Sequence, residues 1–248
     1  MIEALAPAKL TLSLRITGVR DDGYHEIDAE MVTLDLCDRL EIHPSSGGAA
    51  DVRMLDAAGD DFPGVPPAAG NLVERALALA GRGARVTVHK RIPAGAGLGG
   101  GSADAAAVLR WAGFTDTVRA ASIGADVAFC LSGGRARVRG VGEVVEPLAY
   151  VREQYTLLLV PLSCSTAAVY AAWDELGGPT GPAGNDLEAA ALRVAPELAA
   201  WRDELGDATG QTPRLAGSGS TWFVAGAHPG PNRVVATTTE SSRKRRQG

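Results

Sequence analysis

A glycine-rich segment near the middle of the chain has the composition of a phosphate-binding loop. It reads Pro93-Ala94-Gly95-Ala96-Gly97-Leu98-Gly99-Gly100-Gly101-Ser102. A strand-like run at 85–90 precedes it, and a helix-favouring run from about Ser102 follows it. The first backbone N–H groups of a helix have no partner within the helix, and together with the helix dipole they attract an anion. Because glycine also lets the backbone approach a phosphate closely, this segment predicts phosphate binding.

The loop does not match the two best-known phosphate motifs. No Gly-Lys-Ser or Gly-Lys-Thr follows at the Walker A spacing, and nothing fixes the acidic ribose partner of a dinucleotide fingerprint. Taken alone, a Gly-rich pattern also suits a flexible hairpin or a linker. The phosphate interpretation therefore depends on residues elsewhere in the chain.

Lys9 and Thr11 lie two positions apart in the first strand-like run, which extends from Lys9 to Ile16. Polar and apolar residues alternate strictly through this run, and that period predicts a half-buried β-strand. We expect Lys9 and Thr11 to project from one face of the strand. The apolar residues of the run then occupy the opposite face.

Two further segments carry candidate residues, each with an ordinary explanation as well. Asp126 stands at the entry to an apolar segment, where a carboxylate is either a helix cap or a functional group with a perturbed pKa. The segment 215–221 is rich in small residues and includes Gly217 and Ser218. By itself it would be interpreted as a tight turn before the strand-like run that follows.

Composition excludes several classes of protein. The chain has 248 residues, 46% of them hydrophobic, which suits one large globular domain or two small ones. A net charge of −5 leaves no basic excess for nucleic acid, and no apolar run is long enough to span a membrane. The N-terminus lacks a basic signal region, and three widely spaced cysteines favour a reducing compartment. We expect a cytoplasmic protein that binds neither nucleic acid nor membrane.

The patterns predict a mixture of strands and helices in two halves, with the second half beginning near residue 152. Loops rich in Pro and Gly are expected at 44–50 and 57–70, and a frayed basic tail at 241–248, for which a nucleic-acid-binding arm is the alternative. Expected strands cover 9–16, 30–36, 39–43, 85–90, 156–162 and 221–225. Expected helices cover 71–80, a segment from about 102, and segments near 166–176 and 186–205.

Five motifs in a fixed order resemble the GHMP kinases. They read PAKLTLSL…DDGYHEI, IPAGAGLGGGSADAA, GADVAF, GNDLE and LAGSGSTWFV, and the resemblance extends from about Ala6 to Thr239. It implies an α+β, two-lobed GHMP kinase fold with the active site in the cleft between the lobes. The N-terminal lobe, of the ribosomal protein S5 domain 2-like type, would cover 1–151, and the ferredoxin-like C-terminal lobe 152–240.

The resemblance assigns a role to each candidate residue. Pro93–Ser102 matches the ATP-phosphate loop, with Ser102 near the Mg²⁺ ion, and Gly217 and Ser218 match the motif that closes the site beside the phosphates. Asp126 occupies the position of the catalytic aspartate, which accepts the proton of the acceptor hydroxyl. Lys9 matches the lysine beside it, whose charge would keep the carboxylate ionised.

The acceptor side is implied by the segment after the first strand. Tyr24 and His25 match residues that hold a cytosine ring in one branch of the family, by stacking and by hydrogen bonds. Thr11, a further acceptor contact, replaces the asparagine usual in the family and loses an amide donor. The chain is also shorter than usual at 111–123 and at 227–232, where a turn is expected in place of a helix.

The resemblance thus implies a kinase that uses ATP and Mg²⁺ to phosphorylate a hydroxyl group of a small-molecule substrate, as a monomer or weak homodimer. One alternative is a different GHMP small-molecule kinase, of the homoserine or mevalonate type, which Tyr24 and His25 disfavour. Another is a non-catalytic ligand-binding relative. The presence of Lys9, Asp126 and the whole glycine loop disfavours that second reading.

Overall fold

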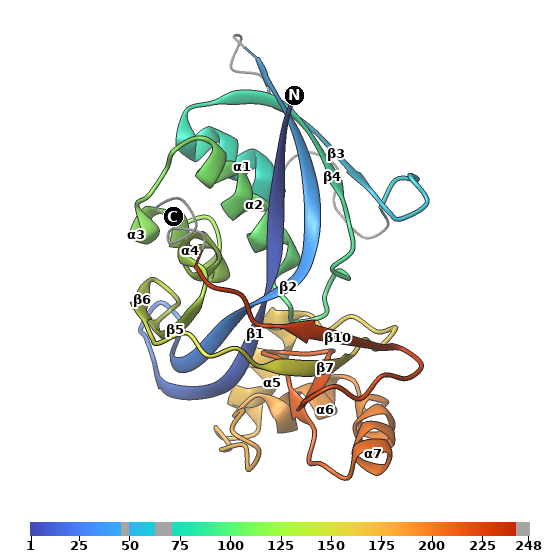
Figure 1. The fold of residues 1–248 in the computed structure, drawn as a ribbon. Coiled ribbons are helices and arrows are strands. Elements are labelled where there is room, and N and C mark those ends of the chain that lie inside the picture. Colours follow the sequence, from blue (N-terminus) through green and yellow to red (C-terminus); the bar gives the residue numbers. More distant parts are fainter. Residues whose placement is uncertain (46–49, 63–70, 242–248) are drawn as a thin grey trace.

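The computed structural model describes residues 1–45, 50–62 and 71–241, which form two antiparallel-rich sheets with helices packed on them (Figure 1). The first sheet has the order β3-β4-β2-β5-β6, with β1 paired to β2. Its strands are β1 (Ile2–Val19), β2 (His25–Ser45), β3 (Ala50–Leu55), β4 (Gly83–His89), β5 (Arg135–Gly140) and β6 (Val144–Pro147). The second sheet has the order β10-β7-β9-β8. Its strands are β7 (Gln154–Leu158), β8 (Arg214–Leu215), β9 (Trp222–Ala225) and β10 (Arg233–Thr237).

The helices divide between the two sheets. Figure 1 shows α1, α2 and α4 beside the long β1–β2 ribbon, and α5, α6 and α7 at the other end of the molecule near β7. The bounds are α1 (Leu72–Ala80), α2 (Gly100–Trp111), α3 (Thr117–Ala121), α4 (Ala125–Ser132), α5 (Thr166–Glu175), α6 (Glu188–Val194) and α7 (Leu198–Thr209). The expected α+β, two-lobed arrangement is confirmed. The lobe boundaries at 151 and 240 stay predictions, and the tail from 242 onward lies outside the described residues.

The two lobes share their hydrophobic interior. Leu10 and Leu12 of β1 are buried with Leu157 of β7 and Phe223 of β9 in one apolar cluster. Since the second lobe covers β1, this strand is buried on both faces near Lys9 and Thr11, which are 5% and 1% exposed. The expectation of a half-buried strand was therefore wrong there. The alternation itself was correct up to Thr11, where a register shift against β2 begins.

Several expected elements end where their local chemistry predicts. Asn71 caps α1 by accepting a hydrogen bond from Val73 N–H, and the helix ends at the left-handed Gly81. The helix expected over 186–205 is instead two helices, because the residue before Pro196 leaves the helical region. The connection at 227–232 contains no helix, as expected.

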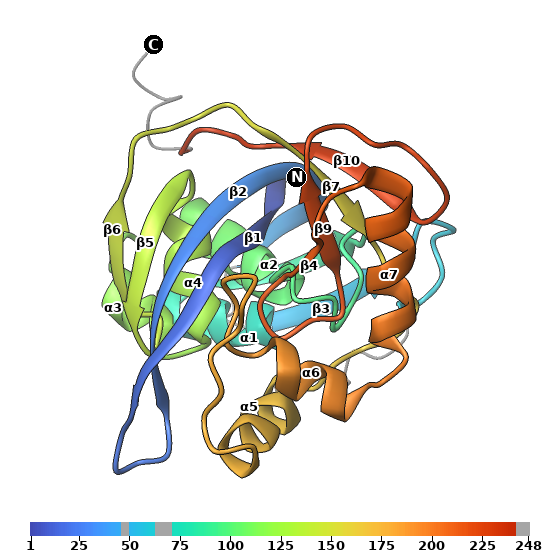
Figure 2. The same cartoon turned by 90° about the horizontal axis from the view of Figure 1, so that it is seen from below.

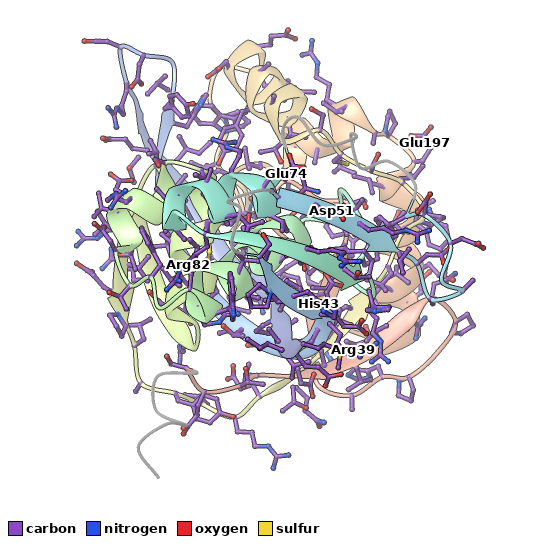
Figure 3. All side chains as sticks on the ribbon, turned by 90° about the horizontal axis from the view of Figure 1, so that it is seen from above. Arg39, His43, Asp51, Glu74, Arg82 and Glu197 are labelled. Carbon is purple, nitrogen blue, oxygen red and sulfur yellow. The ribbon has the colours of Figure 1, made fainter. Side chains whose placement is uncertain are left out.

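The first sheet differs most from the expectation. The two short strands expected at 30–36 and 39–43 are one continuous strand, β2, because β1 pairs with it along its length. Strands β3, β5 and β6 were not expected, and parts of the predicted loop at 44–50 belong to β2 and β3. These are edge or near-edge strands rich in charged residues, whose apolar alternation is weak. Figure 3 shows one such residue, Asp51 of β3, together with Arg39 and His43, which project from β2.

No helix within the described ranges has both the length and the apolar character that crossing a lipid bilayer requires.

The GNDLE segment fastens the second lobe to β1. The buried carboxylate of Asp186 accepts hydrogen bonds from Arg15 Nη1 at 2.6 Å, from Ile16 N–H at 2.9 Å and from Gly181 N–H at 2.9 Å. An isolated parallel bridge joins Leu14 to Asn185 beside it. One side chain thus satisfies two backbone donors and one guanidinium at the junction of the lobes.

We predict that Asp186→Ala lowers the free energy of unfolding by about 2–4 kcal/mol, because it leaves buried donors without partners. Chemical denaturation measures this loss. Asp203→Ala, which removes an exposed carboxylate on α7, is the matched control and should change stability by less than about 0.5 kcal/mol. Equal stability of the two variants would contradict this role for Asp186.

Candidate active site

A cavity of about 550 Å³ lies between the two lobes, a size typical of small-molecule sites. Nearly all of the residues predicted from the sequence line it. They are Lys9, Thr11, His25, Pro93, Ala94, Gly95, Ala96, Gly97, Gly99, Gly100, Gly101, Ser102, Asp126, Gly217 and Ser218. Two predicted residues do not line it: Leu98 is buried in the apolar interior, and Tyr24 is 64% exposed in the turn between β1 and β2.

The glycine loop ends in an uncapped helix. Gly99 is the N-cap of α2, makes no side-chain hydrogen bond there, and no acidic residue occupies the first turn. The first N–H groups of α2 therefore have neither an intrahelical partner nor a carboxylate in their own turn of the helix. With Ser102 also facing the cavity, this end of α2 is suited to bind an anion such as phosphate.

Gly97 and Gly99 of the loop have no room for a side chain. A Cβ atom on Gly97 would lie 2.1 Å from the carbonyl oxygen of Ala216, and one on Gly99 would lie 2.8 Å from Cγ of Lys9. Both glycines also have positive φ angles, 74° and 67°, which L-residues rarely adopt. Glycine is required here because the loop packs directly against Lys9 and against the second small-residue loop.

The second loop is held by a residue whose role the sequence did not reveal. The amide of Asn185, which is 3% exposed, donates to the carbonyl oxygens of Leu215 at 2.9 Å and Gly217 at 2.7 Å, while its oxygen accepts from Leu187 N–H. Ser218 Oγ lies 3.0 Å from Thr166 Oγ1 at the start of α5. The loop that contains Gly217 is therefore fixed beside the cavity from two directions.

Lys9 and Asp126 meet in the cavity, as the resemblance implied. Lys9 Nζ lies 3.5 Å from Asp126 Oδ2 and donates a hydrogen bond of 3.0 Å to Thr11 Oγ1. The Lys9 side chain is 6% exposed, whereas Asp126, in the first turn of α4, is 32% exposed. The carboxylate is thus paired with a cation and still accessible to a ligand, which is the arrangement that a general base requires.

A second buried lysine is neutralised differently. Lys90 Nζ contacts Asp38 Oδ2 at 2.5 Å and Asp104 Oδ2 at 2.7 Å, and all three residues are nearly inaccessible. Burial alone would lower the pKa of Lys90, but the two carboxylates outweigh it and raise that pKa. Burial raises the pKa of Asp104 to about 7, against the opposing charge of Lys90. Its Oδ1 atom has no hydrogen-bond partner within the described residues.

Aromatic residues of α5 surround His25. The His25 ring lies 4.7 Å from the ring of Tyr170 and 5.5 Å from that of Trp173, and both His25 and Tyr170 line the cavity. Burial raises the pKa of the Tyr170 hydroxyl, with the charge of Asp126 adding to the effect, so the hydroxyl stays a neutral donor. Tyr170 was missed because nothing distinguishes an aromatic residue of a predicted helix as a ligand contact.

The cavity also offers oxygen ligands to a hard cation. Ser102 and Asp126 both line it, and hydroxyl and carboxylate oxygens are the donors that Mg²⁺ prefers. Within the described ranges no three His, Cys, Asp or Glu residues cluster as a metal site. The residues therefore fit a Mg²⁺ ion that takes one or two protein ligands and is otherwise held by phosphate oxygens and water.

Comparison with known proteins agrees with the geometry. Residues 68–134 match the family model described as GHMP kinases N terminal domain. The chain is 40% identical over 237 residues to a protein of Paracoccus denitrificans (strain Pd 1222), covering 88% of this chain and 84% of that protein, and 38% identical over 264 residues to one of Cereibacter sphaeroides (strain ATCC 17025 / ATH 2.4.3), covering 95% and 93%. Both relatives are named 4-diphosphocytidyl-2-C-methyl-D-erythritol kinase.

Solved structures give the same result. A crystal structure of 4-(cytidine 5'-diphospho)-2C-methyl-D-erythritol kinase superposes with a TM-score of 0.73 at 31% identity, covering 96% of this chain and 99% of the other. A crystal structure of L. major mevalonate kinase superposes with a TM-score of 0.61 at 14% identity, over 98% of this chain and 97% of the other, which shows the fold alone.

The raised pKa of Asp104 predicts a pH-dependent stability. Since its pKa increases from 3.8 to about 7 on folding, the folded state binds this proton more tightly, and the resulting stability is lost as the pH rises toward 7. As the pH rises from about 5 to about 8, the free energy of unfolding of the native protein should decrease. This decrease should exceed that of Asp104→Asn by about 1 kcal/mol or more. Asp51→Asn, at an exposed position of β3, is the control (Figure 3). A difference between native protein and Asp104→Asn that does not change with pH would contradict the assignment.

Proposed function

Because the chain belongs to the GHMP kinase family, and within it to the 4-diphosphocytidyl-2-C-methyl-D-erythritol kinases, we propose that it transfers the γ-phosphoryl group of ATP to the 2-hydroxyl of 4-diphosphocytidyl-2-C-methyl-D-erythritol. This reaction belongs to the non-mevalonate, or methylerythritol phosphate, route of isoprenoid synthesis. The observation that carries the proposal is the pairing of Lys9 with Asp126 directly beside the glycine loop, inside a cavity that both lobes line.

The phosphate side of the cavity supports ATP as the donor. In our proposal the uncapped start of α2 and the loop Pro93–Ser102 bind the triphosphate, and Gly217 and Ser218 close over it from the second lobe. Mg²⁺, held by Ser102 or Asp126 together with the phosphates, would supply charge neutralisation to the transferred group. Backbone donors are well suited to this task, because phosphoryl transfer depends on alignment and electrostatic stabilisation.

The acceptor hydroxyl would lie at Asp126. In the proposed step the carboxylate of Asp126 accepts the proton of the 2-hydroxyl as the oxygen bonds to the γ-phosphorus and the bond to the bridging oxygen breaks, so that ADP leaves. Lys9 is positioned to stabilise the negative charge, and Thr11 Oγ1 orients the Lys9 ammonium. Although the Thr11 side chain is shorter than the asparagine usual in the family, it thus positions the Lys9 ammonium from the same face of β1.

The acceptor's base would occupy the aromatic side of the cavity. His25 and Tyr170 line this side, and they offer a polar ring and a flat stacking surface to a neutral, planar base. Tyr24, which precedes His25 in the β1–β2 turn, is proposed to stack on the base after the acceptor binds.

We further propose that the enzyme acts in the cytoplasm, where its three free cysteines stay reduced, as a monomer or weak homodimer.

Release of ADP tests the proposal directly. The protein is incubated with Mg-ATP and, in parallel, with 4-diphosphocytidyl-2-C-methyl-D-erythritol, homoserine and mevalonate. We expect turnover only with the cytidylyl acceptor. Turnover with homoserine or mevalonate instead would replace the acceptor assignment, and nucleotide binding without turnover on any alcohol would favour a non-catalytic ligand-binding relative.

Asp126→Ala should lower kcat at least about a hundredfold and leave the dissociation constant for ATP nearly unchanged, because the proton acceptor is lost while the phosphate loop stays intact. Steady-state kinetics and ATP titration measure the two effects. Asp207→Ala, which removes an exposed carboxylate from α7, should retain full activity. Near-normal turnover by Asp126→Ala would remove the base from the mechanism.

Replacing either tyrosine should weaken acceptor binding. Tyr24→Ala and Tyr170→Leu are each expected to raise the acceptor KM about tenfold or more, since a stacked base contributes about 1–3 kcal/mol, and to leave the ATP KM unchanged. Leucine at position 170 keeps most of the apolar volume that Tyr170 packs against the hydrophobic core. An unchanged acceptor KM in one variant would assign the stacking to the other tyrosine, and unchanged values in both would place the base elsewhere.

A further inference from the structure

One face of α5 is directed at the β1–β2 hairpin of the other lobe. Trp173 and Asp174 stand three and four positions after Tyr170, so both lie on the same side of the helix as Tyr170. All three contact the ring of His25, the first residue of β2. Figure 2 shows the hairpin extending from the molecule on the side where α5 lies. His25 is therefore held by three side chains across the junction of the two lobes.

The contact with Asp174 determines which nitrogen of His25 carries the proton. Nε2 lies 2.8 Å from Asp174 Oδ1, which is hydrogen-bond distance. An ionised carboxylate can only accept, so Nε2 must be the donor. In the neutral ring, Nδ1 then keeps its lone pair and is the only other polar atom of the imidazole.

The ring is also fixed in orientation. Its side chain is 9% exposed, between Tyr170 at an interplanar angle of 43° and Trp173 at 82°. The indole N–H of Trp173 donates to the carbonyl oxygen of Pro179 at 2.9 Å, which holds that ring in place. Rotation of the imidazole to exchange its two nitrogens would break the bond to Asp174 and disturb both aromatic contacts.

We propose that Asp174 is a positioning residue for acceptor recognition: it holds His25 as the Nε2–H tautomer, so that Nδ1 accepts a hydrogen bond from the exocyclic amine of the cytosine. This proposal rests on the proposed function, which supplies the cytosine. Uracil carries a carbonyl oxygen where cytosine carries the amine, and two acceptors facing each other leave both unpaired. Asp174 thereby sets a preference for cytosine over uracil without touching the base.

Asp174→Asn tests the proposal, because an asparagine can present either its oxygen or its amide group to Nε2 and no longer dictates the tautomer. We expect the ratio of kcat/KM for the cytidylyl acceptor to that for its uridylyl analogue to fall about tenfold, mainly through a higher KM for the cytidylyl acceptor. The value of kcat and the KM for ATP should change less than about twofold. Glu175→Gln is the control. It alters the next residue, which pairs with Arg193, and it should change neither the kcat/KM ratio nor the KM for the cytidylyl acceptor.

A spectroscopic measurement separates positioning from a merely structural role. The chain has four histidines, so ¹⁵N spectra of imidazole-labelled protein resolve each ring, and His25→Gln identifies the signal of His25. At a pH of about 8, the native protein should show His25 with a protonated Nε2 and an unprotonated Nδ1. Asp174→Asn should show a mixture of the two tautomers.

The outcomes are distinguishable from a failure of the proposed function. A native spectrum with the proton on Nδ1, or an unchanged base preference in Asp174→Asn, would overturn the role of Asp174. Thermal unfolding shows whether Asp174→Asn folds, with Glu175→Gln as the reference. If Asp174→Asn lacks a cooperative transition, the native spectrum alone decides the tautomer. Absence of native turnover with the cytidylyl acceptor would instead overturn the proposed function and, with it, the base preference.

Discussion

The position of the Lys9 ammonium constrains much of the rest of the structure. It is almost fully buried where the two lobes meet, and a buried cation must be paired and hydrogen-bonded to be tolerated. Thr11 and Asp126 supply these partners from β1 and α4. A Cβ atom at Gly99 would lie 2.8 Å from Lys9 Cγ, and one at Gly217 would lie 3.2 Å from Lys9 Nζ. Gly99 therefore needs glycine because of the space that the Lys9 side chain occupies, and Gly217, whose φ of 60° already favours glycine, packs closely against the same side chain.

The two buried lysines of the cavity have different tasks. Lys90 is enclosed by two carboxylates, and Asp38 also accepts from the N–H groups of Arg91 and Ile92 just before the glycine loop. That cluster fixes where the loop begins. The carboxylate that pairs with Lys9, that of Asp126, is open to the cavity. The same kind of ion pair thus supports the chain in one place and, in our proposal, takes part in the reaction in the other.

The sequence was informative where a local rule determined the structure. Alternation placed Lys9 and Thr11 on one face, and the strand–glycine–helix order predicted, without reference to any relative, a glycine loop that leads into a helix. The resemblance was needed to bring Asp126 to Lys9, because 117 positions separate them in the chain. Local patterns could not reveal that the second lobe covers β1, that Asn185 holds the loop at Gly217, or that Tyr170, Trp173 and Asp174 surround His25. The first and the last of these depend on how the lobes meet, and the Asn185 contact depends on tertiary packing within the second lobe.

A double-mutant cycle on Lys9 and Asp126 tests the central claim, that the two residues act as one unit beside the glycine loop. The value of kcat is measured for Lys9→Met, for Asp126→Asn and for the double variant. The account predicts strong non-additivity, with the double variant less than about tenfold slower than the slower single variant. If the two losses simply multiply, Lys9 and Asp126 work independently, and the pairing seen in the cavity is not the basis of the reaction.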